Sequence, residues 1–438
     1  MRRPSLDAVR GFDRAVYVVA AGQLINVLGS GMVYPFATVH FHLEVGIALS
    51  LVGFGLLANN VALAVATAIG GYAADRVGRK PVMIASMAGN AVTLAAYAAV
   101  TDLAALVDPL DAGGAFVLVA TLAGLTAGLY TPAATAYTAD LTAGKDRDRA
   151  YSMLKVANNV GFGTGFVVGG LLYEWISVSV FLADGITSAV VAVVLLSFVP
   201  RVHEGRPGVD LRASVGDWGR AITRRRVVAL AGLNVGFAVM YAQMRTTVPV
   251  VATETLGLSA AQLGTLFVLN PVTLVLLQIP VVDAISDWRR TRGLVASAGF
   301  WTASMVAVWL VYPLGLGRTG ATGTDAAGAL PVLTLGVGLV AAHLVLRTVG
   351  EILHSPVATS LMSDLGTESE RGSQLSLLEV AKRGGFGLGS FLGGLFFDYG
   401  LAAWLWPALA GVCGVLAVGV LLLEGRVSPA ENGVVPAD

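Results

Sequence analysis

The stretch ADLTAGKDRDRAYSMLKVANNVGFGTGFVVGGLLYEW, residues 139–175, returns 224 positions later as SDLGTESERGSQLSLLEVAKRGGFGLGSFLGGLFFDY, residues 363–399. The two copies align without a gap, so Asp140 falls on Asp364. Five glycines of the first copy also meet glycines in the second: Gly161, Gly163, Gly165, Gly169 and Gly170. A repeat of this kind indicates a duplicated structural unit. Glycines spaced by four along a helix in lipid predict close approach of neighbouring helices.

The composition places most of the chain in lipid. Of the 438 residues, 55% are hydrophobic and 13% are charged, and the mean hydropathy is +0.75. Soluble domains carry about 25% charged residues. Basic and acidic residues balance at 28 each, so no net basic field is available to attract nucleic acid. The single cysteine, Cys413, excludes an internal disulfide.

Apolar runs long enough to cross a bilayer recur through the chain, each matching the roughly 20 helical residues that a span requires. They lie at 15–37, 47–71, 82–100, 115–138, 154–174, 179–199, 227–252, 260–284, 293–315, 331–360, 377–397 and 402–423. The runs lack the alternation of barrel strands, and a backbone in lipid must satisfy its own hydrogen bonds. The sequence therefore predicts an all-α membrane protein with twelve transmembrane helices.

The basic residues predict the orientation, because Lys and Arg near span ends remain on the cytoplasmic side. Arg2, Arg3, Arg10 and Arg14 precede the first run, and later clusters occupy alternate connections. These clusters are Arg76, Arg79 and Lys80; Lys145, Arg147 and Arg149; seven arginines from Arg201 to Arg226; Arg289, Arg290 and Arg292; Arg371, Lys382 and Arg383; and Arg426. The other connections carry only Arg318. We expect a multi-pass protein of the plasma membrane with both termini in the cytoplasm.

The runs divide six and six around a polar, arginine-rich segment. This division predicts a six-helix bundle at residues 1–200, a cytoplasmic linker at 201–226 and a second bundle at 227–438. A duplicated six-span unit is typical of transporters in which two bundles rock about a site at mid-membrane depth.

The connection after the second run reads GGYAADRVGRKP, residues 70–81. Six of its residues follow the order G-x-x-x-D-R-x-G-R-K: Gly71, Asp75, Arg76, Gly78, Arg79 and Lys80. This loop resembles the signature of the major facilitator superfamily, and with the duplication and the linker the resemblance covers essentially the whole chain. A weaker echo, SDWRRTRG, begins at Ser286. The resemblance implies two pseudo-symmetric six-helix bundles and a monomer.

The resemblance also implies that this loop gates the transporter. Asp75 is expected to lie near the positive N-terminus of the eleventh span. Either Arg76 or Arg79 is expected to pair with Asp140, and Gly78 should permit a tight turn. The other interpretation is that the basic residues only fix the orientation.

Two opposite charges lie inside the tenth run, in the stretch LRTVGEILHSP, residues 346–356. Arg347 and Glu351 are four residues apart, hence on one helix face, where each would cost about 2.5–3.5 kcal/mol to insert alone. The aligned residues of the first half are Ala123 and Ala127, so the fold does not need these charges. We therefore assign proton coupling to Glu351, modulated by Arg347, while a purely structural ion pair stays open.

Other polar residues in the spans are candidates for a substrate cavity. We expect these to be Asn26, Tyr130, Tyr241, Gln243, Arg245 and Gln278. Arg245 has no acid on its own helix within one turn, which leaves Glu351 or the substrate as its expected partner. For Tyr130, interior packing is the alternative. Amides elsewhere are expected to hydrogen-bond between helices: Gln23, Asn59, Asn60, Asn158, Asn159, Asn234 and Asn270.

No nucleotide-binding loop G-x-x-x-x-G-K-[ST], zinc motif H-E-x-x-H or nucleophile elbow G-x-S-x-G occurs in the sequence. We therefore expect a transporter without enzymatic activity, cofactor or metal, whose partners are lipid, protons and a small molecule. GExxxxP around Glu351 resembles drug/proton antiporters, although Phe166 replaces the proline of the antiporter motif in the fifth run. Proton-coupled efflux of an apolar or amphipathic compound is the leading expectation. The alternatives are proton-coupled uptake of a small organic solute and a membrane sensor that moves nothing.

Overall fold

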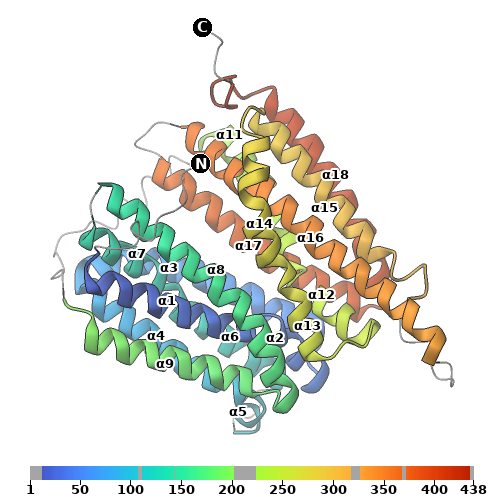
Figure 1. Cartoon of the computed structure of the whole chain (residues 1–438), viewed down its shortest axis with the longest axis horizontal. Helices are drawn as coiled ribbons and strands as arrows, with labels where there is room; N and C mark the ends of the chain where they lie inside the picture. The colour runs from blue at the N-terminus through green and yellow to red at the C-terminus, as the bar shows by residue number, and fades with distance from the viewer. Residues whose placement is uncertain are drawn as a thin grey trace. The chain divides into compact units, whose positions relative to one another are not determined.

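The computed structural model describes residues 12–106, 111–142, 144–201, 223–316, 326–366 and 371–434. Every regular element in these ranges is a helix, which confirms the predicted all-α class (Figure 1). Three groups of predicted features lie outside these ranges: Arg2, Arg3 and Arg10, most of the linker 201–226, and Arg318.

Each of the first six apolar runs coincides with helix. In order, the elements are α1 (Arg14–Val33), α2 (Phe36–Val39) and η2 (His40–Glu44); α3 (Leu49–Val77); α4 (Arg79–Ala98) and α5 (Val100–Leu106); α6 (Ala112–Gly128) and α7 (Tyr130–Leu141); α8 (Gly144–Trp175); and α9 (Ser179–Phe198). The first run ends in a short α-helix followed by a π-helical turn, because the backbone hydrogen bonds change register there.

The second six runs repeat this plan. The elements are α11 (Arg225–Ala242), α12 (Thr247–Val250) and η3 (Val251–Thr255); α13 (Ala260–Phe267) and α14 (Leu269–Ala284); α15 (Arg290–Trp309); α16 (Ala326–Asp364); α17 (Arg371–Asp398); and α18 (Ala402–Glu424). The seventh run is broken like the first and also ends in a π-helical turn. The break in the first span is therefore repeated in the seventh, whereas the breaks between α6 and α7 and between α13 and α14 have no counterpart in the other half.

Nine of the described helical stretches are long and apolar enough to cross a membrane. The other three predicted spans are helical too, and they correspond to α8, α15 and α17. These three carry charged residues in their first turns and glycine or hydroxyl residues farther along, which lowers their hydropathy. The chain is thus a multi-pass membrane protein.

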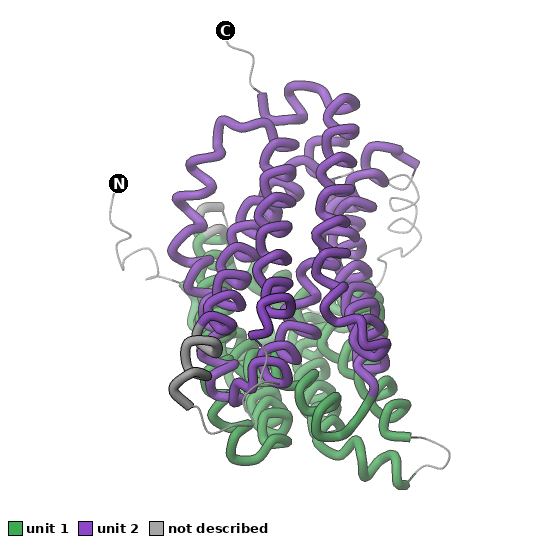
Figure 2. The backbone as a smooth tube through the Cα atoms, turned by 90° about the vertical axis from the view of Figure 1, so that its right-hand side faces the viewer, with its two compact units in different colours: residues 1–47, 58–210 green, residues 48–57, 211–438 purple. Residues whose placement is uncertain are grey.

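The chain forms two compact units, shown in different colours in Figure 2. Unit 1 comprises Met1–Ile47 and Ala58–Asp210, and unit 2 comprises Ala48–Leu57 and Leu211–Asp438. In unit 1, α1 packs on α8 and α4 packs on α6 and α9. In unit 2, α11 packs on α17 and α15 packs on α16 and α18, which is the same arrangement one repeat later. The boundaries at 1–200, 201–226 and 227–438 stay a prediction.

The repeated glycines lie where helices approach most closely. A Cβ atom on Gly165 of α8 would collide with the carbonyl oxygen of Leu28 in α1. A Cβ on the aligned Gly389 of α17 would lie 2.7 Å from the Cα of Val239 in α11. Real Cβ atoms do not approach a backbone so closely, which confirms the predicted packing role of these glycines.

Unit 2 includes the first turns of α3, because residues 48–57 pack on α17. The Asp398 carboxylate, at the end of α17, accepts hydrogen bonds from the backbone amides of Leu49 at 2.9 Å and Ser50 at 2.8 Å. A Cβ on Gly387 would lie 2.6 Å from the Cα of Leu57. The Asp398 carboxylate therefore caps the N-terminus of α3, and the following turns of α3 pack against Gly387 of α17.

Side-chain amides join neighbouring helices, as the sequence predicts. Gln23 of α1 donates to the side chain of Asn158 in α8 at 3.3 Å. Two further contacts join helices through a carbonyl or hydroxyl oxygen: Asn59 to Ala120 at 2.8 Å, and Asn270 to Thr348 at 2.8 Å. These amides hold helices together in surroundings where an unsatisfied polar group is costly.

Candidate functional site

The predicted gating loop forms a tight turn between α3 and α4. Gly78 has φ of 103°, a conformation that residues with a Cβ rarely adopt, and α4 begins at the next residue. Arg79 forms an ion pair with Asp140 near the end of α7 and donates to the carbonyl oxygen of Ala136 at 2.7 Å. Of the two predicted arginines, Arg79 is thus the partner of Asp140.

The remaining loop residues lie around this ion pair. Asp75 lies 3.8 Å from a guanidinium nitrogen of Arg79, whereas Arg76 donates to the hydroxyl of Tyr72 at 3.0 Å. Lys80 donates to the carbonyl oxygen of Leu196 at 2.8 Å, in the last turn of α9, where a cation is favoured. Gly71 lies within α3, and no described atom lies within 4 Å of a Cβ added there. The contact of Asp75 with the eleventh span stays a prediction.

The second half repeats the ion pair at the start of its third span. Arg290, the first residue of α15, binds the Asp364 carboxylate at 2.6 Å and the Ser360 carbonyl oxygen at 3.4 Å. Asp364 and Ser360 are the residues aligned with Asp140 and Ala136. The weak echo SDWRRTRG therefore contains a contact that matches the one in the first half.

The second half adds a C-terminal segment that has no predicted role. Asn432 caps α15, because its backbone and side-chain oxygens accept from the amides of Arg290 and Thr291, each at 3.0 Å. The Glu431 carboxylate binds Arg226, at the start of α11, at 2.8 Å. Burial raises the pKa of Glu431, but hydrogen bonds from Ser428 and the charge of Arg226 outweigh this effect, so that pKa lies below its ordinary value.

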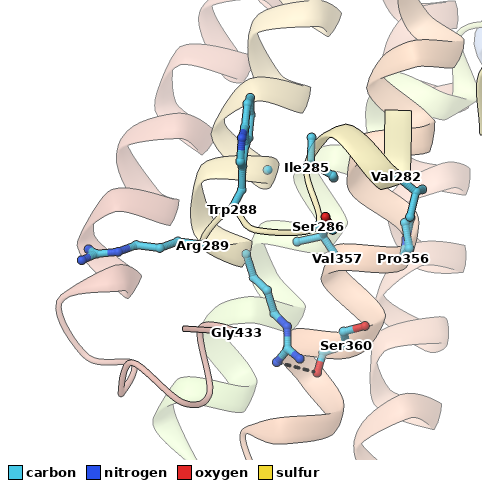
Figure 3. A pocket seen from close by; sticks show the side chains of 11 residues that line it. Val282, Ile285, Ser286, Trp288, Arg289, Pro356, Val357, Ser360 and Gly433 are labelled. Carbon is cyan, nitrogen blue, oxygen red and sulfur yellow. Dashed lines mark hydrogen bonds between the residues drawn. The ribbon is translucent and has the colours of Figure 1, made fainter. Parts of the chain in front are cut away.

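A cavity of about 250 Å³ lies beside this segment in unit 2 (Figure 3). Its walls are Trp288 and neighbouring residues after α14, Val357 and Ser360 on α16, and Gly433 of the C-terminal segment. Arg289 extends away from Val357 in Figure 3 and is ion-paired with Glu424 at 2.9 Å. Because Arg289 and Arg290 are both neutralised, the cavity presents little positive charge to a ligand.

The two charges in the tenth span form an ion pair. An Arg347 nitrogen lies 3.1 Å from the Glu351 carboxylate. The side chain of Arg347 is 4% exposed, whereas that of Glu351 is 26% exposed. The Arg347 backbone oxygen accepts from the Trp301 indole at 2.9 Å, which ties this turn of α16 to α15. The carboxylate is thus the more accessible partner of a buried guanidinium.

Tyr241 of α11 lies at the centre of a charged and aromatic cluster. It is 6% exposed, and its ring centre lies 5.2 Å from the Arg347 guanidinium carbon and 5.5 Å from the Lys382 ammonium nitrogen. Its hydroxyl lies 3.5 Å from Nδ1 of the buried His354, and its ring packs against Trp301. Both cations face the electron-rich aromatic ring, a favourable arrangement for each of them.

The sequence reasoning missed His354 and Lys382. His354 lies three residues after Glu351 and seven after Arg347, so the helical period places all three on one face of α16. Lys382 was expected among the basic residues of the connection after the tenth span, but it lies eleven residues inside α17. Its helical position brings it beside Tyr241, while its side of the membrane stays a prediction.

Gln243 does not face a cavity, contrary to expectation. Its side chain is 0% exposed, and its amide nitrogen donates to the carbonyl oxygens of Val239 at 2.9 Å and Gly389 at 3.1 Å. Its amide oxygen accepts from Thr247 at 2.8 Å. All these groups belong to α11, α12 and α17, so Gln243 joins helices in this structure.

The other candidate cavity residues lie in different surroundings. Asn26 and Gln278 are half-buried, on α1 and α14. Tyr130 is 2% exposed and belongs to the apolar core of unit 1, which favours its interior-packing alternative. Arg245 lies in the break between α11 and α12, and its predicted partner stays a prediction.

Two further polar residues are buried in the spans. His343 is fully buried, and its Nδ1 lies 2.7 Å from the Ser304 hydroxyl oxygen. Asp184 of α9, which the sequence reasoning missed, is also buried, and the Thr187 hydroxyl donates to its carboxylate at 3.3 Å. An acid within an apolar helix is the signal that could have identified Asp184.

Comparison with known proteins agrees with this architecture. The Major Facilitator Superfamily profile matches residues 19–349. An uncharacterized MFS-type transporter, YttB of Bacillus subtilis (strain 168), is 26% identical over 428 residues, covering 96% of this chain and 97% of the relative. The multidrug resistance protein MdtH of Cronobacter sakazakii is 24% identical over 411 residues, covering 93% and 92%.

A solved structure with the same fold is that of the nucleoside transporter NupG. It superimposes with a TM-score of 0.69 at 13% identity and covers 94% of this chain and 99% of that one. The duplicated helix plan, the loop at residues 70–81 and the match over most of the sequence lead to one conclusion. The chain belongs to the major facilitator superfamily of membrane transporters.

Proposed function

We propose that the chain is a secondary active transporter that exports a small apolar or amphipathic compound in exchange for protons. The observation that carries this proposal is the Arg347–Glu351 ion pair inside α16, at 3.1 Å. The aligned residues of the first half are Ala123 and Ala127. A charge pair that the duplicated fold can do without, yet that costs free energy to insert in lipid, suits a functional role.

Glu351 is the proton-accepting group in this mechanism, and Arg347 adjusts its proton affinity. Burial favours the neutral carboxylic acid, whereas a nearby guanidinium favours the carboxylate. Any conformational change that alters the distance between these two groups therefore changes the affinity for a proton. By linkage, proton binding then shifts the balance between the two conformations, which is the requirement for coupling.

The signature loop and its second-half counterpart act as gates in the proposal. Gating residues are Gly71, Asp75, Arg76, Gly78, Arg79, Lys80 and Asp140. Their support is the Arg79–Asp140 ion pair, which ties the start of α4 to the end of α7. The substrate cavity is proposed to include Asn26, Tyr241, Arg245 and Gln278. We further propose a monomer in the plasma membrane with both termini in the cytoplasm.

The names of relatives support efflux as the direction. MdtH proteins from several bacteria are named multidrug resistance proteins, at 22–24% identity to this chain. Uptake of a small organic acid with protons is the second candidate. It is favoured by the cations Arg245 and Lys382, which lie in transmembrane helices or breaks and could bind a carboxylate.

The test is transport by everted membrane vesicles that contain the full chain. Ethidium and a panel of amphipathic dyes are added while a fluorescent dye reports the pH gradient across the membrane. An exporter that exchanges protons accumulates its compound inside these vesicles and dissipates the gradient, whereas a proton symporter does not accumulate it there. A sensor moves no compound.

Glu351→Gln is the deciding variant. We expect it to lose gradient-driven accumulation while keeping exchange of labelled for unlabelled compound, because the amide cannot release a proton. Glu424→Gln is the matched control, since that glutamate is ion-paired with Arg289 outside the proposed pathway. Uphill accumulation by the Glu351→Gln variant would overturn the assignment of proton coupling.

A further inference from the structure

A second, smaller cavity of about 100 Å³ lies where α11, α16 and α17 meet in unit 2. Its lining is polar for the interior of a transmembrane bundle, with Tyr241, His354, Thr359, Glu379 and Lys382 on its walls. Tyr241 and His354 are buried, whereas Thr359 and Glu379 are exposed. The cavity therefore connects the Tyr241 cluster with side chains that reach the surface of the protein.

The two charged residues that line this cavity, Glu379 and Lys382, form no ion pair with each other in the described part of the chain. Glu351 is paired with Arg347 at 3.1 Å, and Glu379 is paired with Arg383 at 3.0 Å. In the described part of the chain Lys382 forms no ion pair, and its ammonium nitrogen lies 5.5 Å from the centre of the Tyr241 ring. The lining thus holds one carboxylate, Glu379, which is already paired with Arg383, and one ammonium group, Lys382, which is not ion-paired among the described residues.

The ammonium group of Lys382 does not take the usual course of a lysine side chain, which extends toward water. Lysine stems often pass along apolar surface so that the ammonium group reaches solvent. Here the ammonium instead lies over the ring of a buried tyrosine that already faces the guanidinium of Arg347 at 5.2 Å. Arg347 is paired with Glu351, whereas Lys382 has no ion pair among the described residues, so an anion in the cavity would stabilise the Lys382 ammonium group.

The size of the cavity limits what that anion can be. A water molecule occupies roughly 30 Å³ in the liquid, so the cavity holds a few waters or one small acidic group. The Tyr241 hydroxyl and the His354 imidazole offer hydrogen bonds to such a group. A carboxylate fits this space, whereas the apolar body of a larger compound has to lie outside it.

We infer that this cavity binds the carboxylate of the transported compound, with Lys382 as the residue that receives it. The transported compound is then an amphipathic acid. Its charge neutralises the Lys382 ammonium group, while its apolar part remains in the wider substrate pathway. The existence of the carboxylate site does not depend on the proposed function. Only the identification of the bound acid as the transported compound rests on that function.

Binding is tested on the purified full-length protein without any transport. Acetate and propionate are the probes, acetamide and propionamide are their uncharged counterparts, and chloride keeps the ionic strength constant. A ligand that binds the folded state raises the thermal unfolding temperature. We expect the two carboxylates to stabilise the protein and the two amides to have no effect. Equal stabilisation by carboxylates and amides would overturn the inference.

Lys382→Met removes the ammonium group and retains most of the side-chain volume. We expect acetate binding to weaken at least about tenfold, as for the loss of one partner of a buried charge pair. Arg371→Met is the matched control, because it changes a cation of the same helix that lies 4.0 Å from Asp364 and does not line the cavity, and it should leave acetate binding intact. Lys382→Arg keeps the charge and should retain binding even if the methionine variant is poorly folded. Undiminished acetate binding by a folded Lys382→Met variant would contradict the proposed site.

Vesicle transport separates this inference from the proposed function. If the inference holds, Lys382→Met loses transport of acidic dyes but keeps transport of their methyl esters. If no compound is transported by the wild-type protein, the proposed function fails, while the acetate measurement still decides whether the site exists. Equal loss of acids and esters would show that Lys382 does not select the acidic group.

Discussion

Arg290 and Asp364 join the first residue of α15 to the last residue of α16 at 2.6 Å, although 73 residues lie between them in the chain. The pair Arg79–Asp140 joins the first residue of α4 to the last residue but one of α7. Each arginine also binds a carbonyl oxygen one turn before its aspartate, on Ser360 and Ala136. The duplication has thus preserved a contact as well as a helix order.

A double-mutant cycle measures this contact in each half. We expect Arg79→Gln and Asp140→Asn to show a coupling free energy of about 1 kcal/mol, since the pair is partly buried but near the surface. Arg290→Gln with Asp364→Asn should give a similar value. Thermal unfolding in detergent provides the measurement. Additive effects in both halves would mean that the ion pairs contribute nothing to stability.

Alanine at Gly165 or Gly389 should destabilise the protein. The added Cβ would collide with the backbone of Leu28 or Val239, and such overpacking costs about 1–3 kcal/mol. Gly414→Ala in α18 is the control, because no described atom lies within 4 Å of its added Cβ. The unfolding temperature should fall for the first two variants and hold or rise for the third. Similar values for all three would contradict the close packing of α1 on α8 and α11 on α17.

Gln243→Leu distinguishes a packing role from a substrate role. The leucine removes the hydrogen bond that the Gln243 amide donates to the carbonyl oxygen of Gly389. We therefore expect the free energy of unfolding to fall by about 1–3 kcal/mol. The set of transported compounds should stay the same. Gln278→Leu is the comparison, with the opposite pattern expected if that side chain lines the substrate cavity. If the Gln243→Leu variant had normal stability but transported a different set of compounds, Gln243 would have to be assigned to the substrate cavity instead.

Docking of the C-terminal segment should depend on pH. The pKa of Glu431 is lowered in the folded protein, so its stabilising contact is present above the unfolded value of about 4.3 and is lost as the pH falls through the folded pKa. A fluorophore on Val434→Cys, with Cys413→Ser, should gain mobility below that pH. Anisotropy provides the measurement. In Glu431→Gln the transition should disappear, and its persistence would assign it to another group.

Much of the fold can be predicted from the sequence, because the signals are local or repeated. The apolar runs follow from the length of a span, and the close contact at Gly165 follows from its alignment with Gly389. The Arg347–Glu351 pair follows from a spacing of four on one helix. In each case the partner lies on the same helix or is marked by the second copy.

The rest depends on how neighbouring helices are rotated about their axes. Tyr241, His354 and Lys382 come from three helices, and their meeting follows from the rotation of α11, α16 and α17 about their axes. Gln243 faces Gly389 for the same reason. The capping of α15 by Asn432 also escapes prediction, because a polar segment after the last span is indistinguishable in composition from a free tail.

The residues of α3 are divided between the two units. Its first turns rest on Asp398 and the glycines of α17, while its later residues belong to the other unit. Any motion that separates residues 49–57 from α17 must break the cap on Leu49 and Ser50 and expose the glycine surface. Loss of the Asp398 carboxylate would therefore weaken the attachment of residues 49–57 to α17 within unit 2.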